Sequence, residues 1–191
     1  MKNIIFSLAA SILFLAACSN ETKKNETTSS ADSITAAGVD TTPKSQQESP
    51  INNIISAYLQ LKNALTKDND KDAASSGKAL ETAFADFDKS SLTADKAKLY
   101  DDIATDAKEH AEHIGANVGN IKHQREHFET LSQDIYDLVK GFGASQKLYV
   151  DHCPMYNENK GANWISESKD ISNPYLGQAM PTCGTVKEEL K

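Results

Sequence analysis

Two cysteines and two methionines lie close together in the last quarter of the chain: Cys153 with Met155, and Met180 with Cys183. Thiolate and thioether sulfurs are soft ligands that select copper(I) over harder cations. Because the members of each pair are two or three residues apart, each pair can offer two sulfurs to one ion from a single turn of chain. The alternative is a disulfide bond between Cys153 and Cys183 with both methionines in the core. The spacing alone slightly favours the disulfide.

All five histidines lie in the second half of the chain. His110 and His113 are three residues apart near the end of one expected helix, and His123 and His127 are four apart near the start of the next, so each pair shares a helix face. A short turn over residues 115–120 brings these helix ends together. Neutral imidazole is a good ligand for copper, zinc and nickel. The alternatives are solvated histidines, stabilised near a helix end by its dipole, or a core role for His110.

No catalytic motif accompanies these side chains. The sequence contains no Gly-x-Ser-x-Gly, no glycine-rich phosphate loop and no His-Glu-x-x-His. Cys-x-x-Cys is absent, so thioredoxin-like redox chemistry has no support, and the absence of Cys-x-x-Cys-His excludes covalent haem. A cysteine with a histidine base would be a nucleophile, but nothing in the spacing supports that pairing. We therefore expect a protein that is not an enzyme.

The N-terminus predicts export and lipid anchoring. Lys2 is followed by an apolar run that ends in Leu15-Ala16-Ala17-Cys18. The run is too short for a permanent membrane span and is typical of a signal peptide. Its end resembles a bacterial lipobox, which implies a signal peptide over residues 1–17, cleavage before Cys18 and a lipid on the Cys18 thiol. The residue after it is Ser19 rather than an aspartate that would suggest inner-membrane retention, so we expect an outer-membrane anchor in the cell envelope. The alternative is an ordinary secreted protein.

The composition argues against one class of partner and divides the chain into a tether and a folded domain. Residues 18–50 are polar and contain no aromatic residue, so we expect a disordered tether between the lipid and a folded domain over residues 51–191. The formal net charge of −7 argues against a nucleic-acid partner, because phosphate binding needs a basic surface. With Cys18 lipidated, Cys153 and Cys183 remain as an even pair in a compartment where disulfides persist.

Helical periodicity runs from residue 51 to residue 142 and predicts an all-α, up-down four-helix bundle. We expect capping near residues 68–70 and at Ser91 or Thr93, and a helix end near Gly143. The predicted apolar stripes are Ile51, Ile54, Ile55, Tyr58, Leu61 and Leu65; Ala73, Gly77, Leu80, Phe84 and Phe87; Tyr100, Ile103, Ala107, His110 and Ile114; and Ile121, Phe128, Leu131, Ile135, Leu138 and Phe142.

A loop-rich C-terminal cap is expected over residues 144–191, because turn formers recur there. Three aromatic residues, Tyr156, Trp164 and Tyr175, are expected to anchor the cap on the bundle. The last helix is roughly 33 Å long, and residues 143–152 can span about 33–36 Å when extended. This reach allows the chain to return along the bundle and to place Cys153 beside the histidine end. The same residues could instead coil at the far end.

A resemblance to a known family rests on an ordered set of residues in the second half of the chain. They are Gln124-Arg125, Phe128, Leu131-Ser132, Cys153-Pro154-Met155, Gly161-Ala162-Asn163-Trp164, Asn173-Pro174-Tyr175, Gly177, Met180 and Cys183-Gly184. The set resembles a bacterial domain-of-unknown-function family of small exported lipoproteins. It is also similar to the C-terminal domain of some periplasmic adaptor subunits of copper and silver efflux pumps. The resemblance covers most of residues 51–187, and it is dense and specific from 124 to 184.

The resemblance implies a helical domain with a role in heavy-metal resistance, and it carries over a set of metal ligands. The implied sulfur ligands are Cys153, Met155, Met180 and Cys183, with His127 and His113 as partners from the helices. Trp164 is expected to pack the cap onto the bundle and to lie over a bound Cu(I). The planar fork of Arg125 suits a carboxylate or carbonyls of the cap, so we assign it a structural role.

The sequence therefore predicts a lipid-anchored envelope protein that binds a soft metal ion. Cu(I) is the expected ion, with zinc or silver as the other candidates. The expected role is to buffer the ion or to pass it to efflux machinery or another envelope protein. The alternative function is a protein-interaction module stapled by a Cys153–Cys183 disulfide.

Overall fold

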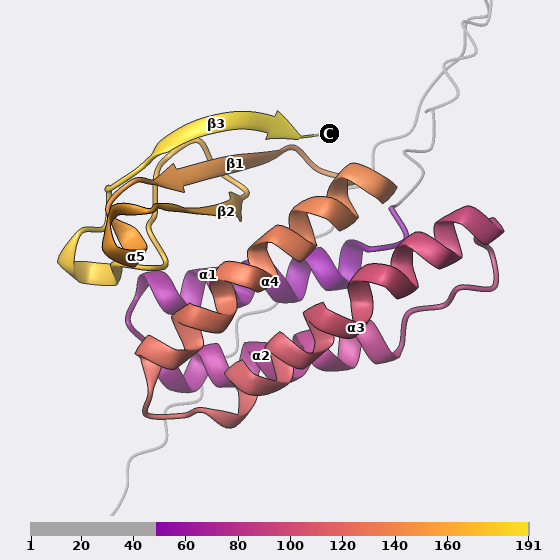
Figure 1. Ribbon diagram of the computed structural model, residues 1–191, viewed down its shortest axis with the longest axis horizontal. Coiled ribbons are helices and arrows are strands. Elements are labelled where there is room, and N and C mark those ends of the chain that lie inside the picture. The colour runs from indigo at the N-terminus through magenta and orange to yellow at the C-terminus, as the bar shows by residue number, and fades with distance from the viewer. Residues whose placement is uncertain (1–48, 191) are drawn as a thin grey trace, which may run out of the picture. The chain divides into compact units, whose positions relative to one another are not determined.

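Four long helices and a small antiparallel sheet make up the part of the chain that the computed structural model describes, residues 49–190 (Figure 1). The helices are α1 (Asn52–Thr66), α2 (Asp70–Ala85), α3 (Ala94–Ala116) and α4 (Ile121–Phe142). The predicted all-α class is confirmed: four helices form a bundle, and the C-terminal part is a smaller, separate layer. The predicted signal peptide, Cys18 and nearly all of the predicted tether lie outside the described residues.

The folded part begins no later than Ser49, which falls inside the predicted tether. The backbone N–H of Ser49 donates to Ser145 Oγ at 2.6 Å, and its hydroxyl donates to the carbonyl of Gly143 at 2.8 Å. Ser49 is buried, and so is Ile51, the first residue of the predicted domain. The end of the predicted tether is therefore bonded to the turn that follows α4.

Side-chain caps set the starts of α2, α3 and α4. The Asn69 side chain accepts a bond from the N–H of Asp72, Thr93 from Lys96, and Asn120 from His123. Such caps satisfy N–H groups that have no partner inside the helix. At the end of α4, Gly143 has φ 74°, a conformation that glycine adopts without a steric penalty. The capping predicted near residues 68–70 and at Thr93, and the helix end near Gly143, are confirmed.

Consecutive helices pack against each other, and the pair α1 and α4 meets through a few buried side chains. The rings of Tyr58 and Phe128 stack with centroids 5.2 Å apart, and the Tyr58 hydroxyl lies 2.8 Å from Ser132 Oγ. The same hydroxyl accepts a bond from the backbone N–H of Ile165 in the sheet. The cap therefore rests on both α1 and α4, and nearly all of the predicted stripe residues are buried or packed on the core.

Helices α2 and α3 approach closely at Gly77. A Cβ atom on Gly77 would lie 2.9 Å from the Ala111 carbonyl oxygen and 2.9 Å from the Gly115 nitrogen. Real Cβ contacts are longer than this, so only glycine allows the two backbones to lie this near. The close approach fixes the C-terminal end of α3, which carries His110 and His113.

The C-terminal part contains a sheet where the sequence predicts mainly loops. Strands β1 (Leu148–Cys153), β2 (Ala162–Ser166) and β3 (Thr185–Leu190) form an antiparallel sheet in the order β2-β1-β3. Five of the six residues of β1 are buried, so its sequence lacks the apolar–polar alternation that identifies a strand. The remaining elements are a turn of positive-φ residues, α5 (Tyr156–Asn159), and a 3-10 turn, η1 (Gly177–Ala179).

Strand β1 runs back along α4, as the reach of the chain predicted (Figure 1). Glu188, which pairs with Val150 in the first half of β1, bonds to Tyr136 and Lys140 near the end of α4. Asn157, just after β1, bonds to Glu129 in the first half of α4. The direction of the return is therefore confirmed. Among residues 49–190 no helix has both the length and the apolar character that crossing a membrane would require.

Candidate functional site

The four predicted sulfur ligands, named here the sulfur cluster, come from the end of β1 and from the turn before β3. Cys153 is the fully buried last residue of β1, and Cys183 is partly exposed. Their Sγ atoms lie 2.9 Å apart and both cysteines are free. A disulfide bond measures about 2.05 Å, so the two thiols touch without being joined.

Both methionines of the cluster are at the surface rather than in the core, contrary to the disulfide interpretation of the sequence. Met155 is 50% exposed and Met180 is 39% exposed. The backbone of each lies next to Cys183: the Cys183 N–H donates to the Met180 carbonyl at 3.2 Å, and the Met155 N–H faces the Cys183 thiol and opposes the rise of its pKa. Two exposed methionines, one just after Cys153 and one just before Cys183, therefore have their backbones next to the thiol pair.

A buried amide holds the turn that carries Cys183. The Asn173 side chain is fully buried and donates to the Cys183 carbonyl at 2.6 Å. Its oxygen accepts the N–H groups of Tyr175 and Leu176 at 2.8 and 2.9 Å. The sequence singled out the Asn-Pro-Tyr segment as a turn and as part of the family resemblance, and the hydrogen bond from Asn173 to Cys183 was missed. The only sequence signal for this role is the residue type, because an asparagine side chain can both donate and accept hydrogen bonds.

Aromatic packing joins the sulfur cluster to the bundle. Trp164 is fully buried and lies edge-on to Tyr175, whose ring lies 5.6 Å from that of Phe128 on α4. A Cβ atom on Gly184, the residue after Cys183, would lie 2.9 Å from the Trp164 ring. Trp164 thus packs the cap onto the bundle, and its expected contact with Cu(I) stays a prediction.

Arg125 links the cap to α1 and to the start of α2. Its Nε donates to the Pro174 carbonyl at 2.7 Å, and its terminal nitrogen donates to the Leu65 carbonyl at 2.9 Å and to Asp68 at 2.5 Å. These hydrogen bonds hold the pKa of Asp68 below its ordinary value, although partial burial opposes them. Carbonyl and carboxylate partners are those expected for its planar fork.

The Cys183 thiol holds its proton more tightly than an ordinary thiol, because its pKa is raised. The hydrogen bond to Cys153 raises the pKa of the Cys183 thiol, and burial adds to the effect. A thiolate is the form that binds metal. Metal binding at this pair would therefore release protons to solvent.

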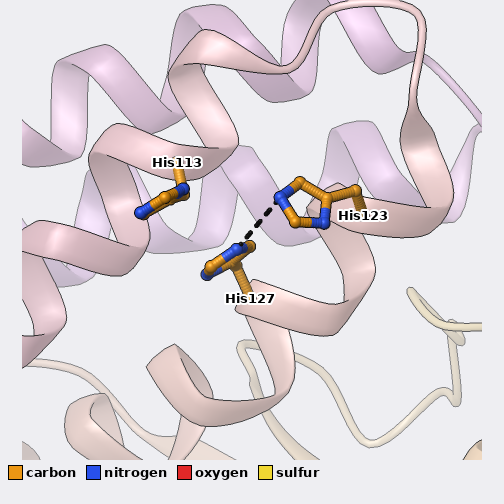
Figure 2. Close-up of side chains that lie close together, drawn as sticks. All are labelled: His113, His123 and His127. Atoms are coloured by element: carbon orange, nitrogen blue, oxygen red, sulfur yellow. Dashed lines mark hydrogen bonds between the residues drawn. The ribbon is translucent and has the colours of Figure 1, made fainter.

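The histidines form a separate group on α3 and α4, named here the histidine cluster: His113, His123 and His127 (Figure 2). One ring nitrogen of each lies within 4.8 Å of the others. The Nε2 atoms of His123 and His127 are 3.2 Å apart, and the ring of His113 stacks on that of His127 at 4.4 Å. Partial burial lowers the pKa of His127, and the neighbouring His113, His123 and His110 lower it further. A lowered pKa keeps this imidazole neutral, the form that binds metals.

His110 connects the histidine cluster to two carboxylates. Its Nδ1 lies 2.9 Å from Nδ1 of His127, and its Nε2 lies 3.7 Å from Asp106. Asp106, His110 and Asp134 again offer ligand atoms within 4.8 Å of one another. One carboxyl oxygen of Asp134 is buried without a hydrogen-bond partner, and burial raises the pKa of this carboxyl to about 7.

The sulfur cluster and the histidine cluster do not converge on one point. Within residues 49–190, neither group of three or more His, Cys, Asp and Glu ligands contains a cysteine. Cys153, which the return of β1 was expected to place beside the histidine end, is in neither group, and its neighbour His152 bonds to Asn163 across the sheet at 2.8 Å. His113 and His127 are therefore grouped with His123 rather than with the sulfurs.

The fold and these sites define a class of protein: a helical bundle with a small sheet that carries one cluster of sulfurs and one of imidazoles. Residues 54–147 match the family model described as a protein of unknown function (DUF3347). The match supports a domain-of-unknown-function family for this stretch, which includes the histidine cluster and ends just before β1. No curated protein and no solved structure matches the chain.

Proposed function

We propose that this chain is a lipid-anchored envelope protein that binds Cu(I) at the sulfur cluster and buffers it or passes it to efflux machinery. The observation that carries the proposal is the pair of free thiols in contact, with two exposed methionines whose backbones lie next to Cys183. All four groups are soft donors of the kind that select Cu(I) or Ag(I). The role is one of binding rather than catalysis.

The geometry allows the site to open with a small movement. At metal–sulfur distances of about 2.3 Å, two sulfurs on one tetrahedral ion lie about 3.8 Å apart. The present separation of 2.9 Å must therefore widen by just under 1 Å. Cys153 is buried in the sheet, so the movement falls on the partly exposed Cys183 side chain, while Asn173 keeps its backbone in place.

The exposed methionines favour transfer over permanent storage. Thioethers bind Cu(I) more weakly than thiolates, and at the surface they can be replaced by ligands of a second protein. The lipobox at Cys18 and the resemblance to domains of copper and silver efflux adaptors support a location in the envelope. Silver and zinc are the other ions that the donor set accepts.

A second function, a disulfide-stapled interaction module, is favoured by the same short separation. Closing the Cys153–Cys183 bond would need a movement of about the same size as metal binding, just under 1 Å, and the loop it closes is about 30 residues long. Such a bond would contribute roughly 3–4 kcal/mol in the chain-entropy model. The two functions differ in the thiol state of the protein isolated from the envelope.

Anaerobic Cu(I) titration of the chain from Ser19 onward, in competition with a chromophoric Cu(I) chelator, tests the proposal. Wild type is compared with Cys153→Ser/Cys183→Ser, with Met155→Leu/Met180→Leu and with the control His113→Asn/His123→Asn. One tightly held ion per chain is expected, lost in the cysteine variant, weakened in the methionine variant and retained in the control. If wild type fails to compete and has no free thiol before reduction, the disulfide module stands instead.

A further inference from the structure

Some ring nitrogens of the histidine cluster face another histidine of the cluster, and others face a neighbouring carboxylate. Nε2 of His123 and Nε2 of His127 face each other at 3.2 Å, and His113 lies over His127 (Figure 2). The other nitrogen of His123 faces Glu126 at 3.3 Å, and Nε2 of His113 faces Glu109 at 3.8 Å. Histidines that bind metals in proteins have this arrangement, in which the second nitrogen is oriented by a carboxylate or another polar group.

His127 has an outer partner of a different kind. Its Nδ1 lies 2.9 Å from Nδ1 of His110, so one of these nitrogens donates and the other accepts. The far nitrogen of His110 faces Asp106 at 3.7 Å. A carboxylate on that side favours a proton on Nε2 of His110, which leaves its Nδ1 free to accept from His127. Nε2 of His127 then carries no proton and is directed at the other two histidines.

The turn between α3 and α4 is held in place by bonds to α2, so the three histidines start from a fixed backbone. The buried side chain of Gln124 donates to the Ile114 carbonyl at 3.2 Å and to the Asp70 carbonyl at 3.0 Å. The Asp70 carboxylate accepts the Gly119 N–H at 2.6 Å. Together with the close approach at Gly77, these contacts fix the ends of both helices. Preorganised ligands of this kind are what a metal site requires.

We propose that His113, His123 and His127 form a second metal centre, for a divalent ion of intermediate softness such as Zn²⁺ or Cu²⁺. Three neutral imidazoles suit these ions and leave a fourth position for water or a further ligand. The centre shares no residue with the sulfur cluster, so it does not depend on the proposed Cu(I) site. His110 is its positioning residue, acting through His127.

Metal binding at the histidine cluster requires the ring of His113 to turn. The lone pairs of an imidazole lie in its ring plane, and the rings of His113 and His127 are now parallel, 5° apart. His113 is 46% exposed, so its ring turns toward the ion without displacing a packed neighbour. His123 and His127 already face each other and provide the first two bonds.

Isothermal titration with Zn²⁺, and Cu²⁺ binding followed by electron paramagnetic resonance, test the centre. Both use the chain from Ser19 onward with Cys153→Ser/Cys183→Ser, so that sulfur cannot contribute. One ion per chain is expected, with nitrogen hyperfine structure in the Cu²⁺ spectrum. His110→Gln should weaken Zn²⁺ binding by about 10- to 100-fold, the usual effect of losing an outer partner, and His123→Asn should weaken it more.

Two control variants make the result decisive. His152→Asn removes a histidine outside the cluster and should leave the affinity unchanged. Asp134→Asn removes a ligand only from the neighbouring Asp106–His110–Asp134 group and should also have little effect. The proposal is overturned if Asp134→Asn abolishes binding while His123→Asn does not, or if His152→Asn and His123→Asn lose affinity equally. If the cysteine variant unfolds, the same series is run in the wild-type chain with Cu²⁺ after the two thiols have been joined by diamide.

Discussion

The Sγ atoms of Cys153 and Cys183 lie 2.9 Å apart although 30 positions of sequence separate the two residues. One thiol sits at the end of a central strand, and the other sits in a turn held by a buried asparagine. The pair is therefore poised between two outcomes, a disulfide bond or a shared metal ion, and each outcome excludes the other.

Treatment of the metal-free chain with diamide should join these two cysteines within one molecule. Two thiols lose two protons and two electrons, which reduce the diamide. Because the bond closes a loop of about 30 residues, we expect a gain of roughly 3–4 kcal/mol in the free energy of unfolding. Urea denaturation with and without reductant measures it. Bound Cu(I) should protect the thiols, and Cys183→Ser should show no gain.

Replacing Asn173 by alanine should destabilise the cap and loosen Cys183. The substitution removes three hydrogen bonds from a fully buried site and leaves their backbone partners unsatisfied. Unsatisfied buried groups cost about 1–3 kcal/mol each, with partial relief from water, so we expect a loss of about 2–4 kcal/mol.

Urea denaturation and the rate of Cys183 alkylation measure the effect of Asn173→Ala. Both should change, because the same amide stabilises the fold and holds the turn. Gln133→Ala, which removes an exposed amide bonded only to Asp137, is the control and should change neither. An unchanged alkylation rate in Asn173→Ala would show that the turn does not depend on this amide.

The helices were predictable from sequence because their signals are local. Apolar stripes at three- and four-residue steps and capping side chains such as Thr93 and Asn120 act within one turn of chain. The sheet was not predictable in this way. Strand β1 is buried on both faces, and its register with β2 and β3 depends on partners far along the chain.

The candidate sites were predicted as groups but not in their arrangement. Helical spacing placed His113 near His123 and His127, because one short turn joins their helices. Spacing could not show on which side of α4 the sulfurs would lie. That side is set by the contacts of Trp164, Tyr175 and Arg125. The exposure of Met155 and Met180 likewise follows from the path of the cap rather than from any local pattern.

Replacing Gly77 by alanine should destabilise the bundle. In an ordinary helix this change stabilises by roughly 0.5–1 kcal/mol, because alanine loses less backbone freedom. Here the new Cβ would meet two backbone atoms of α3 at 2.9 Å, and backbone cannot move aside as a flexible side chain does. Overpacking costs about 1–3 kcal/mol, so the sign of the effect should reverse.

Thermal or urea unfolding of Gly77→Ala shows directly whether the free energy of unfolding rises or falls. Ser75→Ala, at an exposed position of the same helix, is the control and should be neutral or slightly stabilising. Because the end of α3 would shift, Gly77→Ala should also weaken Zn²⁺ binding at the histidine cluster. A stabilised Gly77→Ala variant would show that α2 and α3 separate easily at this point.

Asp151 should make the fold less stable as pH rises from about 4 to 6. Its side chain is fully buried, and neither carboxyl oxygen has a hydrogen-bond partner. Burial raises its pKa from 3.8 to about 6; Lys62 opposes this shift and Glu167 adds to it. Between these two values the folded chain holds a proton that the unfolded chain releases, so the free energy of unfolding falls with pH across that window.

Asp151→Asn should remove this part of the pH dependence, because the amide carries no titrating proton. From pH 4 to pH 7, wild type should lose about 1–2 kcal/mol more than the variant, a value reduced from the full shift to allow for solvent screening. Urea denaturation at the two pH values measures the difference. Asp95→Asn, at an exposed carboxyl on α3, serves as the control and should track wild type. Equal losses in wild type and Asp151→Asn would mean that the Asp151 carboxylate is already stabilised at neutral pH, and Lys62, whose charge lowers the pKa of this carboxyl, would supply that stabilisation.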